Sequence, residues 1–298
     1  MATTKDYPAA ASILIQKRSS MKSSAQSLLA LTLIVVSASA VAQTQAESKP
    51  VWEVGAFVGA ISGPAYPGAE DRTNRVLPLP YFIYRGTTLR AEQGSVGARL
   101  IKTPLLEFDL GFNAALAASS KDVKIRAGMP DLAYLFEVGP RVRLNLARPT
   151  DDSLIRLDLP LRGVVSVDGK GFSGRGATFA PELSYDKRNI GYGWGLNVSA
   201  SAIVGSRGFN EYLYGVAPIY STLSRPQYTA KSGLVTTRLT ATVSNRLTPD
   251  ALVFAFARLD ESSNAANRES PLFRKKTGAT IGVGLAYTLF RSQAKTDE

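Results

Sequence analysis

The chain has 298 residues, of which 45% are hydrophobic, and a formal net charge of +11 at neutral pH. It contains no cysteine and no histidine, which excludes a disulfide framework, a thiolate metal site and the usual general base of neutral-pH catalysis. We therefore predict that the protein is not an enzyme and holds no cofactor and no metal.

Residues 21–42 have the features of a secretory signal peptide. A lysine is followed by an apolar run too short to span a bilayer, and then by small residues that fit a cleavage site. Residues 1–20 lie upstream of this signal, and we interpret them as a mis-assigned extension of the chain. We expect residues 43–298 to form one exported domain, and export argues against a nucleic-acid partner in spite of the basic charge.

The stretch LLEFDLGFNAALA, residues 105–117, alternates between apolar and polar side chains. Because side chains alternate across a β-strand, one face carries Leu106, Phe108 and Leu110, and the other carries Glu107 and Asp109. The same alternation recurs along the chain in runs of about 10–14 residues, whereas a tilted membrane-spanning strand needs about 9–11. The pattern predicts an all-β fold, a closed antiparallel transmembrane β-barrel. A soluble β-sandwich or lipocalin-like barrel is the alternative.

The polar faces of these strands carry charged residues that the barrel would enclose. The predicted lumen-facing charges are Glu107, Asp109, Glu137, Arg141, Arg143, Arg156, Asp158, Arg162, Glu182 and Arg238. These charges would either select solutes or pair with one another and fill the barrel, and we favour the second interpretation at this barrel size.

Short and long connections alternate along the chain, as in outer-membrane barrels with short periplasmic turns and long outer loops. The short connections are residues 102–104, 148–153, 186–189 and 247–251, and the long ones are 117–133, 168–176, 206–232 and 260–276. We interpret GKGFSGRG within the second long connection as a flexible loop. The expected strands are about 79–85, 87–101, 105–117, 133–147, 154–167, 177–186, 190–205, 233–247, 251–259 and 277–290. Ten strands are preferred, and twelve are the alternative if 51–62 and 212–220 are also strands.

Aromatic residues on the lipid-facing side are expected near the membrane–water interfaces. The predicted outward aromatics are Tyr81, Phe108, Phe112, Phe179, Tyr185, Tyr192, Trp194, Phe254, Phe256 and Tyr287. The last strand ends in an aromatic, Phe290, which is similar to the signal read by the outer-membrane insertion machinery, although eight mostly polar residues follow it.

Three segments together resemble the MipA/OmpV family of MltA-interacting outer-membrane proteins. They are GPAYPGAEDRTNRVLPLPYFIYRG (63–86), YLYGVAPIYSTLSRPQYTAKSGL (212–234) and RLDESSNAANRESPLF (258–273). The residues that carry the resemblance include Pro64, Tyr66, Gly68, Asp71, Pro80, Tyr81, Tyr214, Gly215, Val216, Ser270 and Pro271. The similarity covers most of residues 51–290.

The family resemblance implies a location in the cell outer membrane of a Gram-negative envelope. It also implies a scaffold that joins a lytic transglycosylase to a murein synthase in peptidoglycan biosynthesis, bound through the periplasmic turns and residues 43–62. A small channel for hydrophilic solutes is the competing hypothesis. Basic residues in the predicted outer loops would attract lipopolysaccharide phosphates, so lipopolysaccharide and outer-membrane lipids are expected partners.

Overall fold

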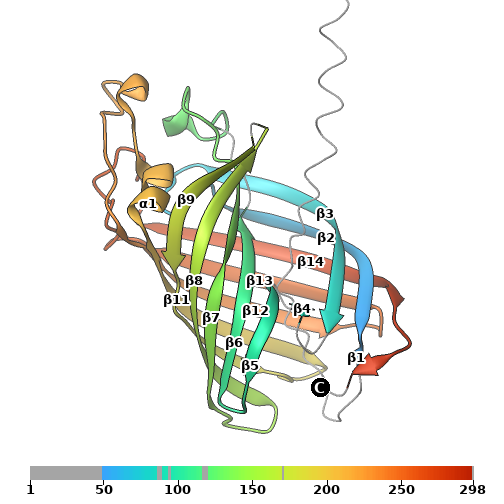
Figure 1. Ribbon diagram of the computed structural model, residues 1–298. Coiled ribbons are helices and arrows are strands. Elements are labelled where there is room, and N and C mark those ends of the chain that lie inside the picture. Colours follow the sequence, from blue (N-terminus) through green and yellow to red (C-terminus); the bar gives the residue numbers. More distant parts are fainter. Residues whose placement is uncertain (1–48, 86–88, 93–94, 116–119, 170, 297–298) are drawn as a thin grey trace, which may run out of the picture. The chain divides into compact units, whose positions relative to one another are not determined.

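The computed structural model describes residues 49–85, 89–92, 95–115, 120–169 and 171–296. The predicted upstream extension and signal segment, 1–42, lie outside the described residues. Figure 1 shows long antiparallel strands that carry almost all of the regular structure. Within the described residues, no helix is long and apolar enough to cross a membrane.

The elements are joined by connections of very different length. In chain order they are β1 (Lys49–Pro50), β2 (Trp52–Pro64), β3 (Arg72–Arg85), β4 (Leu89–Glu92), β5 (Ser95–Lys102), β6 (Leu106–Ala115), η1 (Lys124–Arg126), β7 (Tyr134–Ala147), β8 (Ser153–Asp168), β9 (Gly171–Phe179), β10 (Glu182–Lys187), β11 (Trp194–Gly205), α1 (Arg207–Tyr214), η2 (Pro218–Tyr220), β12 (Gly233–Arg246), β13 (Ala251–Glu261), β14 (Thr277–Arg291) and β15 (Lys295–Thr296).

The antiparallel sheet closes on itself. Its order is β10-β11-β12-β13-β14-β2-β3-β4-β5-β6-β7-β8-β9, and β10 also pairs with β8 while β11 also pairs with β9. Since β9 and β10 follow each other in the position between β8 and β11, each strand from β2 to β14 has a hydrogen-bonded neighbour on both sides. The fold is therefore the predicted closed antiparallel transmembrane β-barrel. Its closure is weakest at β3, of which only Tyr84 and Arg85 pair with β4 among the described residues.

The two faces of the wall differ as the alternation predicted. On the outward face, Leu110, Val138 and Leu161 are 41%, 52% and 53% exposed. On the inward face, their close neighbours Asp109 and Arg141 are 6% and 8% exposed. An exposed apolar surface of this extent on a closed barrel is the surface that faces lipid.

The preferred count of ten strands is wrong for the part of the chain that the structure describes. Taking β9 and β10 as one position, the wall has twelve positions. Residues 52–62 belong to β2, which closes the barrel between β14 and β3. The expected strand 87–101 is divided into β4 and β5. The alternative count of twelve is met by different strands, because residues 212–220 lie in α1, η2 and the connection between them.

The two ends of the barrel are different, as the alternation of connections predicted. One end carries the short connections at 103–105, 148–152, 188–193 and 247–250, and it also carries β1 paired with β15. We call it the short-turn end. The opposite, long-loop end carries residues 65–71, 120–133, 206–232 and 262–276. The expected long connection at 168–176 is wrong, since β9 begins at Gly171 and the GKGFSGRG segment mostly continues the wall.

Three of the predicted outward aromatics lie on the inward face instead. The hydroxyl groups of Tyr81 and Thr288 form a hydrogen bond of 2.5 Å. Phe254 stacks on Phe57 with ring centroids 5.8 Å apart. Phe256 shares the inward face with Phe254 and covers Gly282, where a Cβ would overlap its ring. On the inward faces of β2, β3, β13 and β14, aromatic rings therefore pack over glycines.

The alternation of short and long connections predicts the topology in the cell. A peptide tag inserted after Gly128 or Asn264, both in long connections, should be detected on intact cells. A tag after Asp151, in a short turn, should be detected only after the outer membrane is permeabilised. Surface labelling of intact and permeabilised cells measures the exposure of each tag. Labelling of the Asp151 insertion in intact cells would show that the barrel has the opposite orientation.

Candidate functional site

A run of ion pairs covers the inward faces of β6, β7 and β8. Arg141 donates from Nε and Nη2 to the two carboxylate oxygens of Asp109, at 3.0 and 2.6 Å. Beside this bidentate pair, Arg143 Nε donates to Asp158 Oδ1 at 3.0 Å, and Arg156 Nε lies 3.6 Å from the same oxygen. Charges this close to one another neutralise each other inside the barrel.

The ion pairing continues on both sides of this run. Arg162 lies 3.5 Å from Glu137, and Arg238 Nε donates to Asp260 Oδ1 at 2.6 Å. The side chains of these four residues are between 7% and 22% exposed. The charged inner wall is therefore largely occupied by paired side chains rather than lined by free ones.

The structure places every predicted lumen charge on this one inward face. These are Glu107, Asp109, Glu137, Arg141, Arg143, Arg156, Asp158, Arg162, Glu182 and Arg238. Sequence reasoning missed further inward charges, namely Glu53, Arg75, Arg85, Asp186, Arg258 and Asp260. Glu53 and Arg85 form a buried pair at 2.7 Å, and the alternation of β2 could have revealed the first of them.

The connections at the long-loop end interlock with one another. We call residues 65–71, 120–133, 206–232 and 262–276 the loop cover. Tyr66 Oη donates to Leu272 O at 2.8 Å, Tyr214 Oη donates to Pro67 O at 2.8 Å, and Ser270 Oγ donates to Tyr214 O at 2.7 Å. These three bonds join segments that are 56 to 206 residues apart in the chain.

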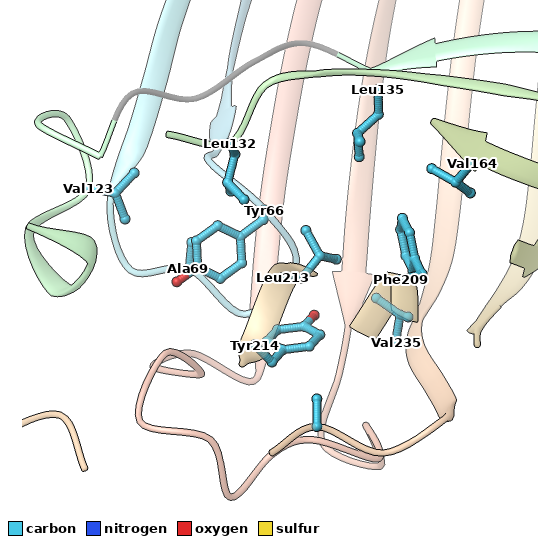
Figure 2. Close-up of a cluster of buried hydrophobic side chains, with 11 residues drawn as sticks. Tyr66, Ala69, Val123, Leu132, Leu135, Val164, Phe209, Leu213, Tyr214 and Val235 are labelled. Atoms are coloured by element: carbon cyan, nitrogen blue, oxygen red, sulfur yellow. The ribbon is translucent and has the colours of Figure 1, made fainter. Parts of the chain in front are cut away.

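An apolar cluster holds the same connections together, and Figure 2 shows its side chains. Tyr66 and Tyr214 meet edge to face with ring centroids 6.1 Å apart, and Leu213 lies beside them. Val164 of β8 and Val235 of β12 belong to the cluster, which therefore packs on the barrel wall. Burial raises the pKa of Tyr66 to about 12 and also raises the pKa of Tyr214, so both phenols stay neutral at physiological pH.

Two buried arginines complete the loop cover by donating to backbone carbonyls. Arg126 Nη1 donates to Leu213 O at 3.1 Å. Arg225 Nη1 donates to Ile125 O and Ala127 O at 2.7 and 2.9 Å, and its Nη2 donates to Tyr220 O at 2.8 Å. Five donors in a fixed fork suit this role. The loops are therefore held in one arrangement.

Most family-motif residues lie in or beside the loop cover. Gly68 has a φ of +87°, and a Cβ there would lie 2.5 Å from the ring of Phe273, so a side chain is excluded on both counts. Asp71 Oδ2 accepts from Lys124 N at 2.8 Å. The remaining members are Tyr66, Tyr214, Gly215, Val216, Ser270 and Pro271 in the loop cover, Pro64 at the end of β2, and Pro80 and Tyr81 in β3. The motif thus mainly builds the loop cover.

The charged inner wall and the loop cover differ in how their polar groups are paired. Among the described residues, no group of three or more acidic, histidine or cysteine side chains could hold a metal ion. The inward carboxylates face arginines, and the buried tyrosines donate to carbonyls.

Solved structures with a similar fold are outer-membrane proteins with low sequence identity. A bacterial polysaccharide outer membrane secretin has 7% identity and a TM-score of 0.39, with 82% of this chain and 100% of that chain covered. Outer membrane phospholipase A from Escherichia coli has 11% identity and a TM-score of 0.37, with 82% and 100% covered. OmpT of Vibrio cholerae, without loop L8, has 9% identity and a TM-score of 0.32, with 80% and 99% covered.

Comparison with curated proteins gives no match. The model of one protein family matches residues 55–289, from β2 to β14, and so includes both the charged inner wall and the loop cover. The chain therefore belongs to the family described as MltA-interacting protein MipA.

Proposed function

We propose that this outer-membrane barrel is a non-conducting, non-enzymatic adaptor that binds a lytic transglycosylase, MltA, on the periplasmic side. The name of the matching family supports the partner. The paired inward charges carry the argument against a channel, because a conducting lumen needs side chains that solvent and solutes can reach. In this view the ion pairs and the loop cover give the adaptor a fixed shape.

The proposed binding mode keeps the expected periplasmic turns but not the whole of the expected segment 43–62, of which residues 43–48 lie outside the described residues. Residues 43–62 were the expected periplasmic segment, but residues 52–62 form β2, which is hydrogen-bonded to β14 and β3. Deleting them would open the barrel. By the topology of bacterial barrels, the short-turn end faces the periplasm, and its turns are the part of the described chain that a periplasmic enzyme would meet. A murein synthase would join the complex through the bound enzyme or beside it.

The loop cover would face lipopolysaccharide, and its positive charge supports that contact. Arg268, Lys275 and Lys276 are exposed there. Arg126 and Arg225 are buried and already donate to carbonyls, so these two basic residues serve the loops rather than a lipid phosphate.

Conductance and enzyme retention test the adaptor against the channel. The refolded chain should give low or no steady conductance in planar bilayers, because arginines and carboxylates pair across the inner wall. The same protein immobilised in detergent should retain a purified lytic transglycosylase. Stable, ion-selective openings with no retained enzyme would favour the small channel for hydrophilic solutes.

A further inference from the structure

Four turns of the short-turn end are hydrogen-bonded to neighbouring strands. Asn145 Nδ2 of β7 donates to Pro104 O at 3.0 Å, and Asn245 Nδ2 of β12 donates to Tyr192 O at 3.0 Å. Lys187 Nζ donates to Asp152 Oδ1 at 2.6 Å, and this bond lowers the pKa of Asp152. We call residues 103–105, 148–152, 187–193 and 246–250 the rim.

The fourth turn is held by the last strand of the barrel. Arg291 of β14 pairs with Asp250 and donates to Pro249 O, and Thr288 N donates to Asp250 O at 2.8 Å. Because these four turns are held in this way, a partner would bind a preformed surface. Little of the turn backbone would have to become ordered on binding.

Tyr192 stands out on the rim for its backbone and for its exposure. Its φ is +53°, and it is the one residue other than glycine with a positive φ among those the structure describes. Its neighbours Gly191 and Gly193 also have positive φ values, so glycine would suit this position better than a bulky aromatic residue. The side chain is nevertheless 101% exposed and contributes nothing to packing within the chain. A strained, fully exposed ring points to a contact outside the molecule.

Further apolar side chains lie close to Tyr192. Ile190 is in the same turn and is 52% exposed, and Leu247 begins the next turn and is 60% exposed. Asn245 of β12, two residues before Leu247, donates to Tyr192 O, so the three side chains share one region of the rim. We call Ile190, Tyr192 and Leu247 the rim patch.

Charge and position favour a protein over lipid as the occupant. The rim patch follows Lys187, Arg188 and Arg246 in the chain, so it lies beyond the charged residues that end the lipid-facing strands. Aromatic residues that serve the membrane interface lie inside the strands, as Trp194 and Tyr287 do. Asp152 pairs with Lys187 and Asp250 pairs with Arg291, which leaves three basic residues of the rim against one acid. They are Arg148, Arg188 and Arg246 against Asp151.

We propose that the rim patch docks a soluble periplasmic protein through an apolar pocket bordered by carboxylates, with the Tyr192 ring inserted in that pocket. This inference rests on the proposed adaptor function and names the surface that performs it. A rigid aromatic anchor surrounded by a polar rim is the arrangement in which single side chains dominate binding.

Substitution of Tyr192 by glycine tests the proposal without harming the fold. Glycine accepts the positive φ, so heat-modifiable gel mobility of the refolded chain should be unchanged. Retention of a purified soluble lytic transglycosylase by the immobilised variant should fall at least about tenfold, as for a hot-spot aromatic. Leu223→Ser is the matched control, because Leu223 is 107% exposed at the opposite end and its loss should leave retention unchanged.

Charge reversal tests the predicted carboxylates of the partner. The double variant Arg148→Glu and Arg188→Glu should retain less of the enzyme than the unchanged chain. The difference in retention between the two should shrink at high salt. Lys275→Glu with Lys276→Glu, at the long-loop end, is the control and should have no effect.

The outcomes separate the docking surface from the function on which it rests. If the unchanged chain and the Tyr192→Gly variant retain the enzyme equally well, the rim patch is not the docking surface, but the adaptor function stands. No retention by the unchanged chain would overturn both. A photo-crosslinker placed at residue 192 in phosphatidylethanolamine–phosphatidylglycerol bilayers should capture the added enzyme, and capture of lipid alone would overturn the docking of a protein.

Discussion

Replacing Arg141 by methionine is expected to lower the free energy of unfolding by about 3–5 kcal/mol. The guanidinium makes two hydrogen bonds to Asp109, and both side chains are 9% exposed. The substitution leaves the Asp109 carboxylate buried without this partner, and the cost of an uncompensated buried charge exceeds the worth of the pair. Equilibrium unfolding of the refolded barrel in detergent, followed by tryptophan fluorescence, measures the change.

Two further variants separate the buried charge from the loss of side-chain packing. Arg141→Met combined with Asp109→Met should recover most of the stability, because no charge is then left unpaired. Arg268→Met is the surface control: its pair with Glu269 lies at 3.3 Å with side chains 58% and 78% exposed, so about 0–1 kcal/mol is expected. A loss below about 1 kcal/mol for Arg141→Met would mean that water solvates this part of the inner wall, which would weaken the case against a channel.

Sequence reasoning located both the strand and its inward face in β6, β7 and β8, whose two faces contrast sharply. In β6, β7 and β8 the inward positions carry opposite charges that meet in register, such as Asp109 opposite Arg141 and Arg143 opposite Asp158. Both the strand and its inward face follow from such a pattern, because burial of a charge and exposure of a leucine to water are both unfavourable in the other register.

β13 was assigned the opposite face because its apolar residues lie on both sides of the wall. Residues 252–257 read LVFAFA, and either phase gives an apolar face. The following Arg258 and Asp260 settle the phase, since they share a face with Phe254 and Phe256. β2 alternates in sequence but was left out of the preferred count, because ten strands fitted the alternation of short and long connections. Its pairing with β14, more than 200 residues away, leaves no sign in local sequence.

The loop cover could not be predicted from local pattern. YLYGVAPIY alternates like a strand, yet its first three residues end α1, with Ser206 in an extended conformation before the helix. The segment is helical because Leu213 and Tyr214 pack against Tyr66, whose position depends on Leu272. Resemblance to a family marked these residues, but only the fold shows that three distant motifs meet in one cluster.

Replacing Leu110 by arginine tests which face of the wall meets lipid. Leu110 lies in the middle of β6 on the outward face, opposite Pro140 of β7, and is 41% exposed. In lipid, its apolar side chain stabilises the folded barrel. An arginine near the bilayer midplane on the outer wall of a barrel costs about 2–4 kcal/mol. We therefore expect a lower yield of folded protein and a lower free energy of unfolding in lipid vesicles.

Glu107→Gln, three residues away in the same strand, is the matched substitution on the inward face. Its carboxylate lies 3.9 Å from Arg143, which also pairs with Asp158 at 3.0 Å, so the amide leaves that arginine with a partner. Folding into vesicles should therefore be unchanged, and the folded form of each variant can be quantified by its heat-modifiable gel mobility. Equal folding of Leu110→Arg and Glu107→Gln would show that the outward face of β6 does not meet hydrocarbon, because a guanidinium placed there would then have remained in water.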